Sequence, residues 1–319
     1  MFFGAAFAAA TETPEMDRPV AITGNKVKIW ARYDLFTEGM DLLNYRSRFH
    51  SSTVLKQFDQ WKFGINHAPF ATGAWRAVLF GSQQKLSRTL QPTQINSHYR
   101  GFSLAWQQTL LKARRTRTVL EFGIGRQRSP NTFFDRYNTS PNVEIIAAPG
   151  RHLVNISAWS KEWRLALRQG WQASPAWLFH GDLNYRQLRI ESHMDSYDPL
   201  VRASLRSPQN EPWQEQHIGF NIDGEWHFSS AWQVSMGWQH IQIRRKNYRQ
   251  ISGNLDYNTQ DIINTHLYYH INRRLTAYWR AQANTRFLLG DAPLAYNSRT
   301  SARFHAPFGF LSFGLTFSL

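Results

Sequence analysis

The sequence predicts an all-β fold, a meander of antiparallel strands, and three observations lead to that prediction. Apolar and polar residues alternate with the period of two that a strand imposes, and this pattern returns along most of the chain. Short polar turns join many alternating segments, which makes neighbouring strands antiparallel hairpins. Mean hydropathy is −0.50, and no segment approaches the roughly 20 consecutive apolar residues of a membrane-spanning helix.

Composition indicates one structural unit that is rich in aromatic side chains. No linker, low-complexity tract or block of charge divides the 319 residues. The chain contains 13 Trp, 12 Tyr and 22 Phe, a high aromatic content for so polar a sequence. Cysteine is absent, which excludes disulfides, thiolate metal sites and cysteine nucleophiles, and fits passage through an oxidising compartment.

The N-terminus has features of a targeting segment. Residues 1–10, MFFGAAFAAA, look like the apolar region and small-residue cleavage site of a secretory signal peptide whose basic start is missing. We therefore expect a truncated signal peptide at 1–10 and a polar, proline-containing periplasmic lead-in at 11–24. The folded unit is expected to span 25–319.

Several segments alternate clearly between large apolar residues and polar or small ones. In chain order they are 26–35, 101–110, 163–172, 177–186, 218–228, 232–239, 275–289 and 308–319. In the last segment, Leu311, Phe313 and Leu315 share one face. Ser312 and Gly314 lie on the other face. Each segment is therefore predicted to be a strand with one apolar face and one face of polar or small residues.

Connections between these strands are of two kinds. The short turns are predicted at 112–116, 174–175, 229–230 and 272–274. The longer connections, rich in Pro, Asn, Asp and Ser, are predicted at 88–96, 129–141 and 192–214. No segment has the apolar periodicity of an amphipathic helix, so no helix is expected.

Two architectures suit such a meander, and the aromatic pattern decides between them. A soluble barrel or sandwich points its apolar face inward and uses about eight strands, fewer than this chain supplies. In a transmembrane barrel the apolar face meets lipid, aromatic residues gather at both interfaces, and strands are roughly ten residues long. The sequence therefore predicts a transmembrane antiparallel up-and-down β-barrel of about 14 strands, within a range of about 12 to 16. The aromatic girdles are assigned to Trp163, Trp171, Trp177, Trp226, Trp232, Trp238 and Trp279.

These features resemble the Gram-negative outer-membrane β-barrel proteins as a class, over residues 25–319. The last strand is similar to the closing strand of such barrels, although Leu319 stands where class members usually end on Phe or another aromatic residue. The resemblance implies export through the periplasm to the outer membrane and contact with its lipid and lipopolysaccharide. It also implies that the barrel assembly machinery recognises the C-terminal strand.

Polar faces that line a lumen would give it charges of both signs with a positive excess. The candidate lumen residues are Arg164, Arg168, Arg186, Arg280, Arg286, His180, Asp182, Asp223 and Glu225, with Lys26, Lys28, Arg32, Asp34 and Glu121. One interpretation is a ladder of ion pairs that fills and stiffens the barrel. The other is a passage that favours anions, because basic side chains in a low-dielectric wall raise the local anion concentration.

Formal net charge is +15, and much of the excess lies in clusters in or beside turns. They are Lys112, Arg114, Arg115 and Arg117; Arg244, Arg245, Lys246 and Arg249; and Arg273 with Arg274. At a membrane interface these clusters would neutralise phosphates of lipid or lipopolysaccharide. Binding to nucleic acid is not expected, because no recognition helix or aromatic platform accompanies them.

Two groups of His, Ser and acidic residues raise the question of catalysis. His180 and Asp182 share a polar face, and further Ser, His and Asp residues crowd 192–198. A His oriented by a carboxylate could activate a Ser or a water, but the patterns of outer-membrane phospholipases and omptin-like proteases are missing. Hydrogen bonding within a lumen and a solvated loop is the favoured interpretation. No cofactor or metal is expected, since the His residues lack ligand spacing.

We therefore expect an outer-membrane pore or export protein that passes a polar, anionic solute or polymer, and not an enzyme. Two alternatives stay open: an outer-membrane hydrolase acting on lipid or lipopolysaccharide, and a structural or surface-adhesion barrel without transport. Side chains that fill the lumen would favour the structural alternative, and a clear bore would favour transport. A Ser beside His180 or His193 would favour the hydrolase.

Overall fold

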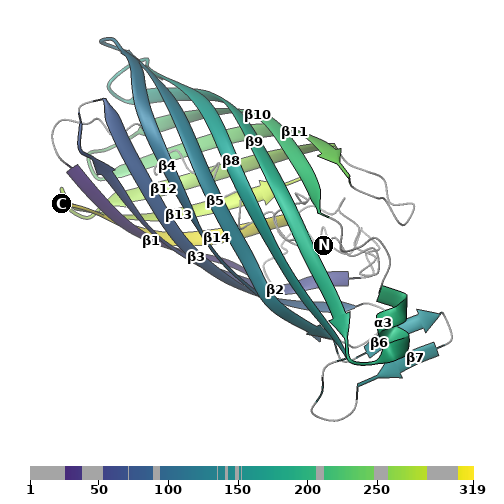
Figure 1. The fold of residues 1–319 in the computed structure, drawn as a ribbon. Coiled ribbons are helices and arrows are strands. Elements are labelled where there is room, and N and C mark those ends of the chain that lie inside the picture. The colour runs from purple at the N-terminus through teal and green to yellow at the C-terminus, as the bar shows by residue number, and fades with distance from the viewer. Residues whose placement is uncertain are drawn as a thin grey trace.

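A single sheet curls round until its first and last strands pair in the computed structural model of the chain (Figure 1). The structure describes residues 26–37, 53–70, 72–88, 94–134, 136–140, 143–147, 151, 153–205, 212–247, 258–285 and 308–319. The expected signal peptide at 1–10, the lead-in at 11–24 and the candidate Arg286 lie outside these residues. In the described part, each barrel strand is antiparallel to the next along the chain, and β5 pairs with β8.

The barrel strands vary from 10 to 20 residues. Their bounds are β1 (Lys26–Thr37), β2 (Thr53–Ala68), β3 (Gly73–Arg88), β4 (Gln94–Lys112), β5 (Thr116–Phe134), β8 (Val154–Gln172), β9 (Trp177–Ser196), β10 (Trp213–His227), β11 (Trp232–Lys246), β12 (Thr259–His270), β13 (Leu275–Asn284) and β14 (Phe308–Ser318). Several strands exceed the roughly ten residues needed to cross a bilayer, so they extend beyond it.

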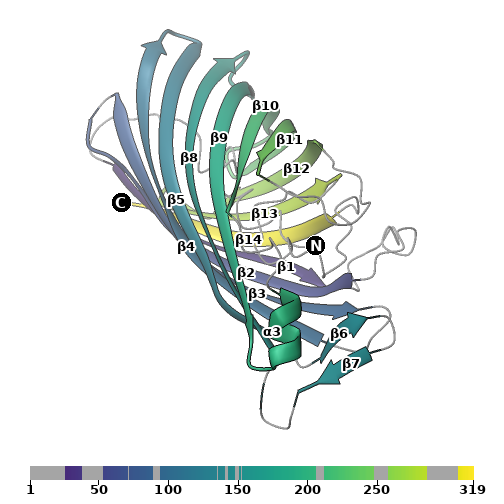
Figure 2. The same ribbon diagram turned by 45° about the vertical axis from the view of Figure 1, so that its right-hand side comes forward.

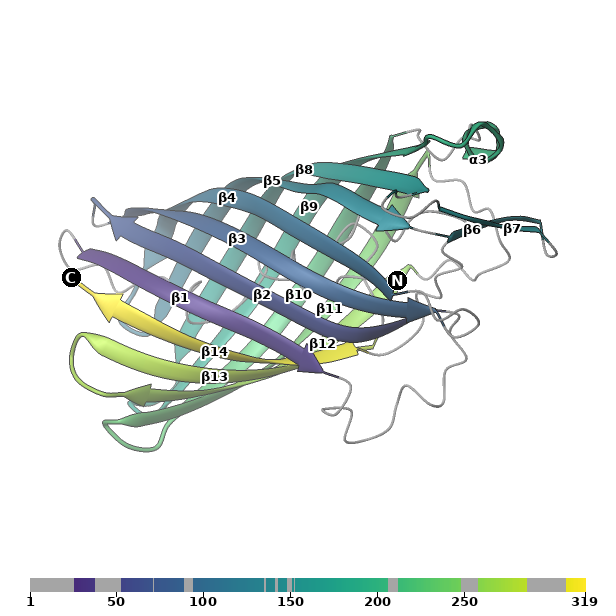
Figure 3. The same ribbon diagram turned by 90° about the horizontal axis from the view of Figure 1, so that it is seen from below.

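Closure is made by β14 against β1, which lie side by side in Figure 3. Ile29 stands opposite Phe317, and Leu35 stands opposite Leu311. The prediction that the C-terminal segment is the closing strand is confirmed. Closure matters because a barrel without edges pairs its backbone groups within the sheet, as a hydrocarbon environment demands.

The predicted strand number was too high. Within the described residues the closed barrel has 12 strands, not about 14, at the lower limit of the predicted range. The cause is strand length: β4, β5 and β8 each take up 19 residues, nearly twice the length assumed from the sequence. The alternating pattern locates strands but does not show where one of them ends, because polar residues also occupy strand ends outside the membrane.

Two of the predicted long connections contain regular structure. In place of a loop at 129–141, β5 runs on to Phe134 and a small separate sheet follows, made of β6 (Arg136–Ser140) and β7 (Val143–Ile146). Within 192–214, β9 continues to Ser196 and is followed by a seven-residue helix, α3 (Pro199–Leu205), which was not expected. Figure 2 shows α3 with β6 and β7 beyond one end of the barrel. No helix in the described part of the chain is long and apolar enough to cross a bilayer.

The two ends of the barrel differ in their connections. At the end that we call the short-turn end, the connections between strands are 69–72, 113–115, 173–176, 228–231 and 271–274. The start of β1 and the end of β14 also lie there, since Lys28 pairs with Ser318 and Lys26 with Ala68. The opposite, long-loop end carries α3, β6 and β7. This asymmetry is typical of outer-membrane barrels, with short turns on the periplasmic side.

Side-chain burial follows the predicted period of two. In β11, exposed and buried positions alternate, and Met236 is 63% exposed on the outer face whereas Gln233 is 1% exposed on the inner face. Phe102, Leu165 and Ile222 likewise lie on the outer face. Because the outer wall is apolar and the inner wall is polar, the arrangement is the reverse of a soluble barrel and the same as that of a transmembrane one.

The aromatic residues assigned to girdles all lie on the outer wall. Trp171, Trp177 and Trp226 form a row near the short-turn end, where the Trp177 and Trp226 rings stack 5.8 Å apart. Trp232 extends this row and contacts Tyr269, with 4.6 Å between ring centroids. The remaining three, Trp163, Trp238 and Trp279, stand further from the short-turn ends of their strands.

Candidate functional site

The inner wall carries the charged side chains, and it forms the candidate functional site. Arg164, Arg186, Arg280, Asp223 and Glu225 are all buried there. Arg168, His180 and Asp182 face the same way and are partly buried. Arg32 and Asp34 of β1 and Glu121 of β5 are buried on this wall as well, and the Lys28 side chain is partly buried. The strand pairing divides these residues into three groups.

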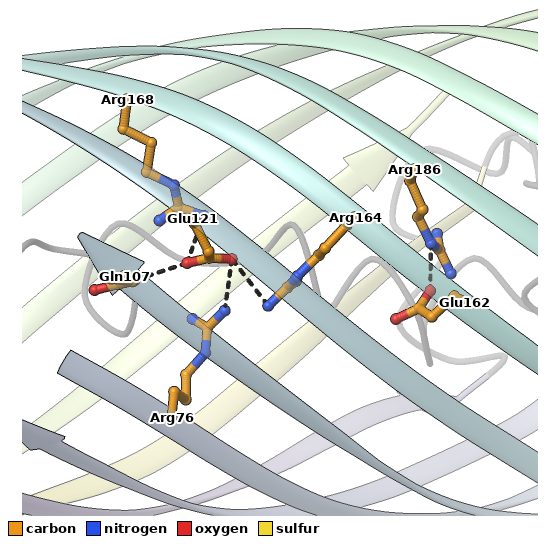
Figure 4. A network of polar contacts seen from close by, with 7 residues as sticks. All are labelled: Arg76, Gln107, Glu121, Glu162, Arg164, Arg168 and Arg186. Atoms are coloured by element: carbon orange, nitrogen blue, oxygen red, sulfur yellow. Dashed lines mark hydrogen bonds and ion pairs between the residues drawn. The ribbon is translucent and has the colours of Figure 1, made fainter. Parts of the chain in front are cut away.

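The first group is centred on Glu121 of β5 and is called the arginine hub (Figure 4). Arg76 of β3 and Arg164 of β8 approach one carboxylate oxygen, with Nη2 to Oε1 distances of 3.2 and 3.0 Å. Arg168 lies 3.5 Å from the other oxygen, Oε2, to which the Gln107 amide donates a 2.7 Å hydrogen bond. Three guanidinium groups from two sides therefore share one carboxylate, so basic side chains outnumber the acidic one around Glu121.

Glycine residues on the inner face of β5 give this group its shape. A Cβ atom at Gly123 would lie 2.6 Å from Nε of Arg164, and one at Gly125 would lie 2.7 Å from Oε1 of Glu162. The absence of side chains at these positions lets Arg164 and Glu162 lie flat across β5. Glu162 then accepts a 2.5 Å charged contact from Nε of Arg186, as drawn in Figure 4.

The second group lies on β1 and β2. Arg32 and Lys62 are cross-strand partners, and like charges in that position repel each other. Asp34 compensates both, because its carboxylate lies 2.7 Å from Nε of Arg32 and 3.4 Å from Nζ of Lys62. Arg280 of β13 lies in the same row of the wall, since Asp34 and Arg280 both pair with Ser312. Here again one carboxylate is shared by several basic groups.

The third group is acidic and lies on β9 and β10. Asn221 donates to Asp182 at 3.2 Å, and Asn184 donates to Asp182 at 2.9 Å. Asp223 and Glu225 continue along β10, and Glu225 contacts Nε2 of His227 at 2.5 Å. Because Asp182 stands opposite Arg168 in the β8–β9 register, this acidic wall borders the arginine hub directly.

Sequence reasoning missed several members of these groups. Lys62, Arg76 and Glu162 were not assigned to the lumen, nor were Glu215 and Arg245, which form a 3.1 Å ion pair near the long-loop end of β10 and β11. A recoverable signal was present for Lys62, which sits between Trp61 and Phe63 in an alternating run. The pairing of Arg76 with Glu121 joins β3 to β5 and could not be predicted without the strand order.

Three of the polar residues in 192–198, Asp195, Ser196 and Asp198, make contacts at the junction of β9 and α3. Asp198 is the N-cap of α3, accepting hydrogen bonds at 2.9 and 3.0 Å from the backbone of Leu200 and Val201. Asp195 lies 3.2 Å from Nε of Arg202, and Ser196 donates to the carbonyl of Leu153 at 2.5 Å. The interpretation of 192–198 as a solvated loop was therefore wrong for 192–196, which belong to β9, and only 197 and 198 lie in a connection between β9 and α3.

Two other His side chains of the barrel contact a polar side chain of the inner wall. The hydroxyl of Ser235 lies 3.1 Å from Nδ1 of the buried His266 on the inner wall. Glu215 lies 2.9 Å from Nε2 of His217. Among the described residues, no group of three or more His, Asp or Glu side chains is arranged to hold a metal ion.

The closed antiparallel sheet, the apolar outer wall with its Trp rows and the charged inner wall define the class. The chain has the fold of the Gram-negative outer-membrane β-barrel proteins. By sequence it matches no family model and no curated protein.

Solved structures with a similar fold share little sequence with the chain. The translocator domain of the autotransporter NalP from Neisseria meningitidis has a TM-score of 0.53 at 11% identity, covering 98% of both chains. The Pseudomonas putida toluene transporter TodX has a TM-score of 0.48 at 7% identity, covering 100% of this chain and 94% of the other. The COG4313 outer membrane channel from Pseudomonas putida F1 has a TM-score of 0.48 at 10% identity, covering 97% of this chain and 100% of the other.

Proposed function

We propose that the chain is an outer-membrane channel that passes a polar, anionic solute. The observation that carries the proposal is the sharing of carboxylates on the inner wall. Glu121 faces three arginines, and Asp34 faces Arg32 and Lys62, so basic side chains outnumber the carboxylate at each of these two positions. Arginine stays charged at any physiological pH, and the low-dielectric wall confines its field to the lumen.

Burial of the inner wall limits what such a channel passes. Glu121 and Asp34 are both 0% exposed, and Lys62 is 1% exposed. These side chains are therefore covered by neighbouring protein atoms. A small anion fits this geometry better than a polymer, and we expect a low conductance with a sharp size limit.

The acidic wall gives the proposed passage a transverse field. Arg168 and Asp182 face each other across neighbouring strands at the same height. A solute at this level would meet guanidinium groups and carboxylates side by side on neighbouring strands. An anion that also carries hydrogen-bond donors, such as a hydroxylated acid, would match both walls.

The test is conductance in planar lipid bilayers under a salt gradient. The purified barrel is expected to give a reversal potential on the anion side, and the double change Arg164→Gln with Arg168→Gln should move it towards zero. The matched control, Arg114→Gln with Arg115→Gln, removes the same charge from exposed positions in a short turn and should leave the potential unchanged, because exposed charges are screened within about 10 Å at 0.1 M salt. A cation preference of the unmodified barrel would overturn the proposal.

A second candidate is a structural barrel without transport, which the same burial favours. Such a barrel would fold and insert but conduct at no voltage. A heat-modifiable band in detergent gels, shown by the preparation that fails to conduct, would establish this alternative. Hydrolysis of phospholipid or lipid A by that preparation would instead identify the hydrolase considered from the sequence.

We further propose the location and assembly route that the sequence resemblance implies. The chain is exported through the periplasm, and the barrel assembly machinery recognises β14, whose outer face presents Leu311, Phe313 and Phe317. The protein should co-fractionate with outer membranes. Phe317→Ser should lower the yield of folded barrel in cells more strongly than refolding in detergent, where no machinery acts. Equal losses in both settings would contradict the recognition of β14.

A further inference from the structure

An exposed basic patch lies on the outer wall at the long-loop end of β4, β5, β8 and β9. It consists of Arg100, Arg126, Arg128, Lys161 and Arg189. None of these residues belongs to the basic clusters that the sequence analysis placed in or beside turns. Each of them stands inside a strand. The patch becomes visible only when neighbouring strands are set in register.

The register places like charges directly opposite each other three times. Arg100 pairs with Arg128 across β4 and β5. Arg126 pairs with Lys161 across β5 and β8, and Lys161 pairs with Arg189 across β8 and β9. Directly opposed like charges destabilise a sheet, so this arrangement has a cost in the isolated barrel.

Protein carboxylates compensate little of this charge. Arg189 contacts Glu191 at 2.9 Å, and in the described residues this is the one ion pair that a member of the patch makes. The Arg126 guanidinium and the Lys161 ammonium lie 5.9 and 5.1 Å from the ring centroid of Trp159. Trp is enriched at membrane interfaces, where its amphipathic ring sits at the level of the headgroups, and its ring face attracts cations.

The height of the patch matches that level. The next outward positions towards the short-turn end are Phe102 after Arg100, Ile124 before Arg126 and Trp163 after Lys161, and the first two are strongly exposed apolar side chains. The patch therefore stands at the border of the apolar band, on the side away from the short turns. With short turns on the periplasmic side, this border faces the outer leaflet.

Two other strands in the described part of the barrel carry an acidic residue at the same border. On β12 it carries Asp261, which lies 2.9 Å from Nδ1 of His240. On β2 it carries Asp59, which accepts a 2.6 Å hydrogen bond from Tyr33. These two positions are acidic, whereas the patch gathers five basic side chains on four neighbouring strands, which favours a localised ligand over general attraction to an anionic surface.

We propose that this patch binds the phosphate groups of the outer-leaflet glycolipid, lipid A. The guanidinium group of Arg binds phosphate through two parallel hydrogen bonds. A phosphate placed between Arg126, Lys161 and Arg189 would therefore turn three mutually repelling charges into partners of one anion. The acyl chains would extend along the apolar band over Ile124 and Leu165. The proposal does not depend on what passes through the lumen.

The test compares lipid binding by native mass spectrometry of the detergent-purified barrel. The probes are bis-phosphorylated lipid A, dephosphorylated lipid A and phosphatidylglycerol. The triple change Arg126→Gln, Arg128→Gln and Lys161→Gln should weaken lipid A binding about a hundredfold. The matched triple change Arg114→Gln, Arg115→Gln and Arg273→Gln, at the short-turn end, should leave lipid A binding unchanged.

A second measurement compares the thermal stability of the barrel with and without lipid A. The expected direction of the change is one that a patch with a purely structural role would not give. In detergent without lipid A, Lys161→Gln should raise the temperature at which the folded band is lost, because it removes two like-charge contacts. With lipid A present, the unmodified barrel should gain stability and the variant should gain little. Equal binding of lipid A by both triple variants, or equal binding of dephosphorylated lipid A or of phosphatidylglycerol by the unmodified barrel, would overturn the proposal.

Discussion

The inner and outer faces of β5, β8 and β9 use the same residue types in opposite ways. On the inner face, Arg164 and Arg186 stand opposite each other, and Glu121 and Glu162 lie within 3.0 and 2.5 Å to compensate them. On the outer face, Arg126 and Lys161 stand opposite each other with an aromatic ring beside them and no described carboxylate in contact.

This difference shows that the cross-strand position of a basic residue does not by itself determine whether the residue is paired with a carboxylate. A buried charge must be paired, because leaving it unpaired away from water costs several kcal/mol, whereas an exposed charge tolerates a repelling neighbour at small cost. The inner face therefore had to acquire carboxylates in order to fold. The outer face did not, and its charge remains available to an external anion.

The largest expected effect comes from removing one carboxylate on each face. Glu121→Gln should destabilise the folded barrel by about 3 to 5 kcal/mol, because it leaves buried arginines without their shared partner. Glu191→Gln should cost about 0 to 1 kcal/mol, since Glu191 is 25% exposed and its partner Arg189 is 57% exposed. Unfolding in guanidinium, followed by gel mobility, measures both. Similar costs for the two would remove the distinction between the faces.

A second prediction concerns depth on the outer face. Met236→Arg places a charge in the middle of the apolar band and should cost about 2 to 4 kcal/mol and impair assembly. Gln242→Arg, six residues along on the same strand and face, should cost about 0 to 1 kcal/mol, because it lies near the interface beside Arg244. Yield of folded barrel in membranes reports the difference. If Gln242→Arg proved the more harmful, the apolar band would be misplaced.

A third, smaller effect tests how the glycines shape the inner face. Gly123→Ala should cost about 1 to 3 kcal/mol, because the new Cβ would lie 2.6 Å from Nε of Arg164 and push it away from Glu121. Gly181→Ala is the control, since the nearest atom to its Cβ would be a carbonyl oxygen at 3.8 Å. Thermal loss of the folded band compares them. Equal stability of the two variants would show that Arg164 does not depend on the open space above β5.

Much of the fold follows from local sequence. The period-two pattern assigns Arg164, Asp182 and Gln233 to the inner face and Trp171 to the outer one, because a strand turns alternate residues to opposite sides. Turns such as the one at Ser229 and Ser230 are recognisable by composition. The Ser229 hydroxyl accepts hydrogen bonds from the backbone amides two and three residues further along the chain. These features depend on neighbours in the chain.

The missed features depend on partners far along the chain. Arg76 meets Glu121 from 45 residues away, and Arg126 faces Lys161 across a pairing of β5 with β8 that skips β6 and β7. The helix α3 is held by its Asp198 cap and has too few residues to show an apolar period. Strand number failed for a related reason, since the ends of β5 and β9 are polar and extend into segments that look like loops.

One measurement tests the central claim, that charge on the inner wall selects an anion. Arg168 and Asp182 stand opposite each other on β8 and β9 at the same height, so each is the control for the other. In planar bilayers under a salt gradient, Arg168→Gln should move the reversal potential away from the anion side, and Asp182→Asn should move it further towards that side. Shifts in the same direction, or no shift in either variant of a conducting barrel, would contradict the account.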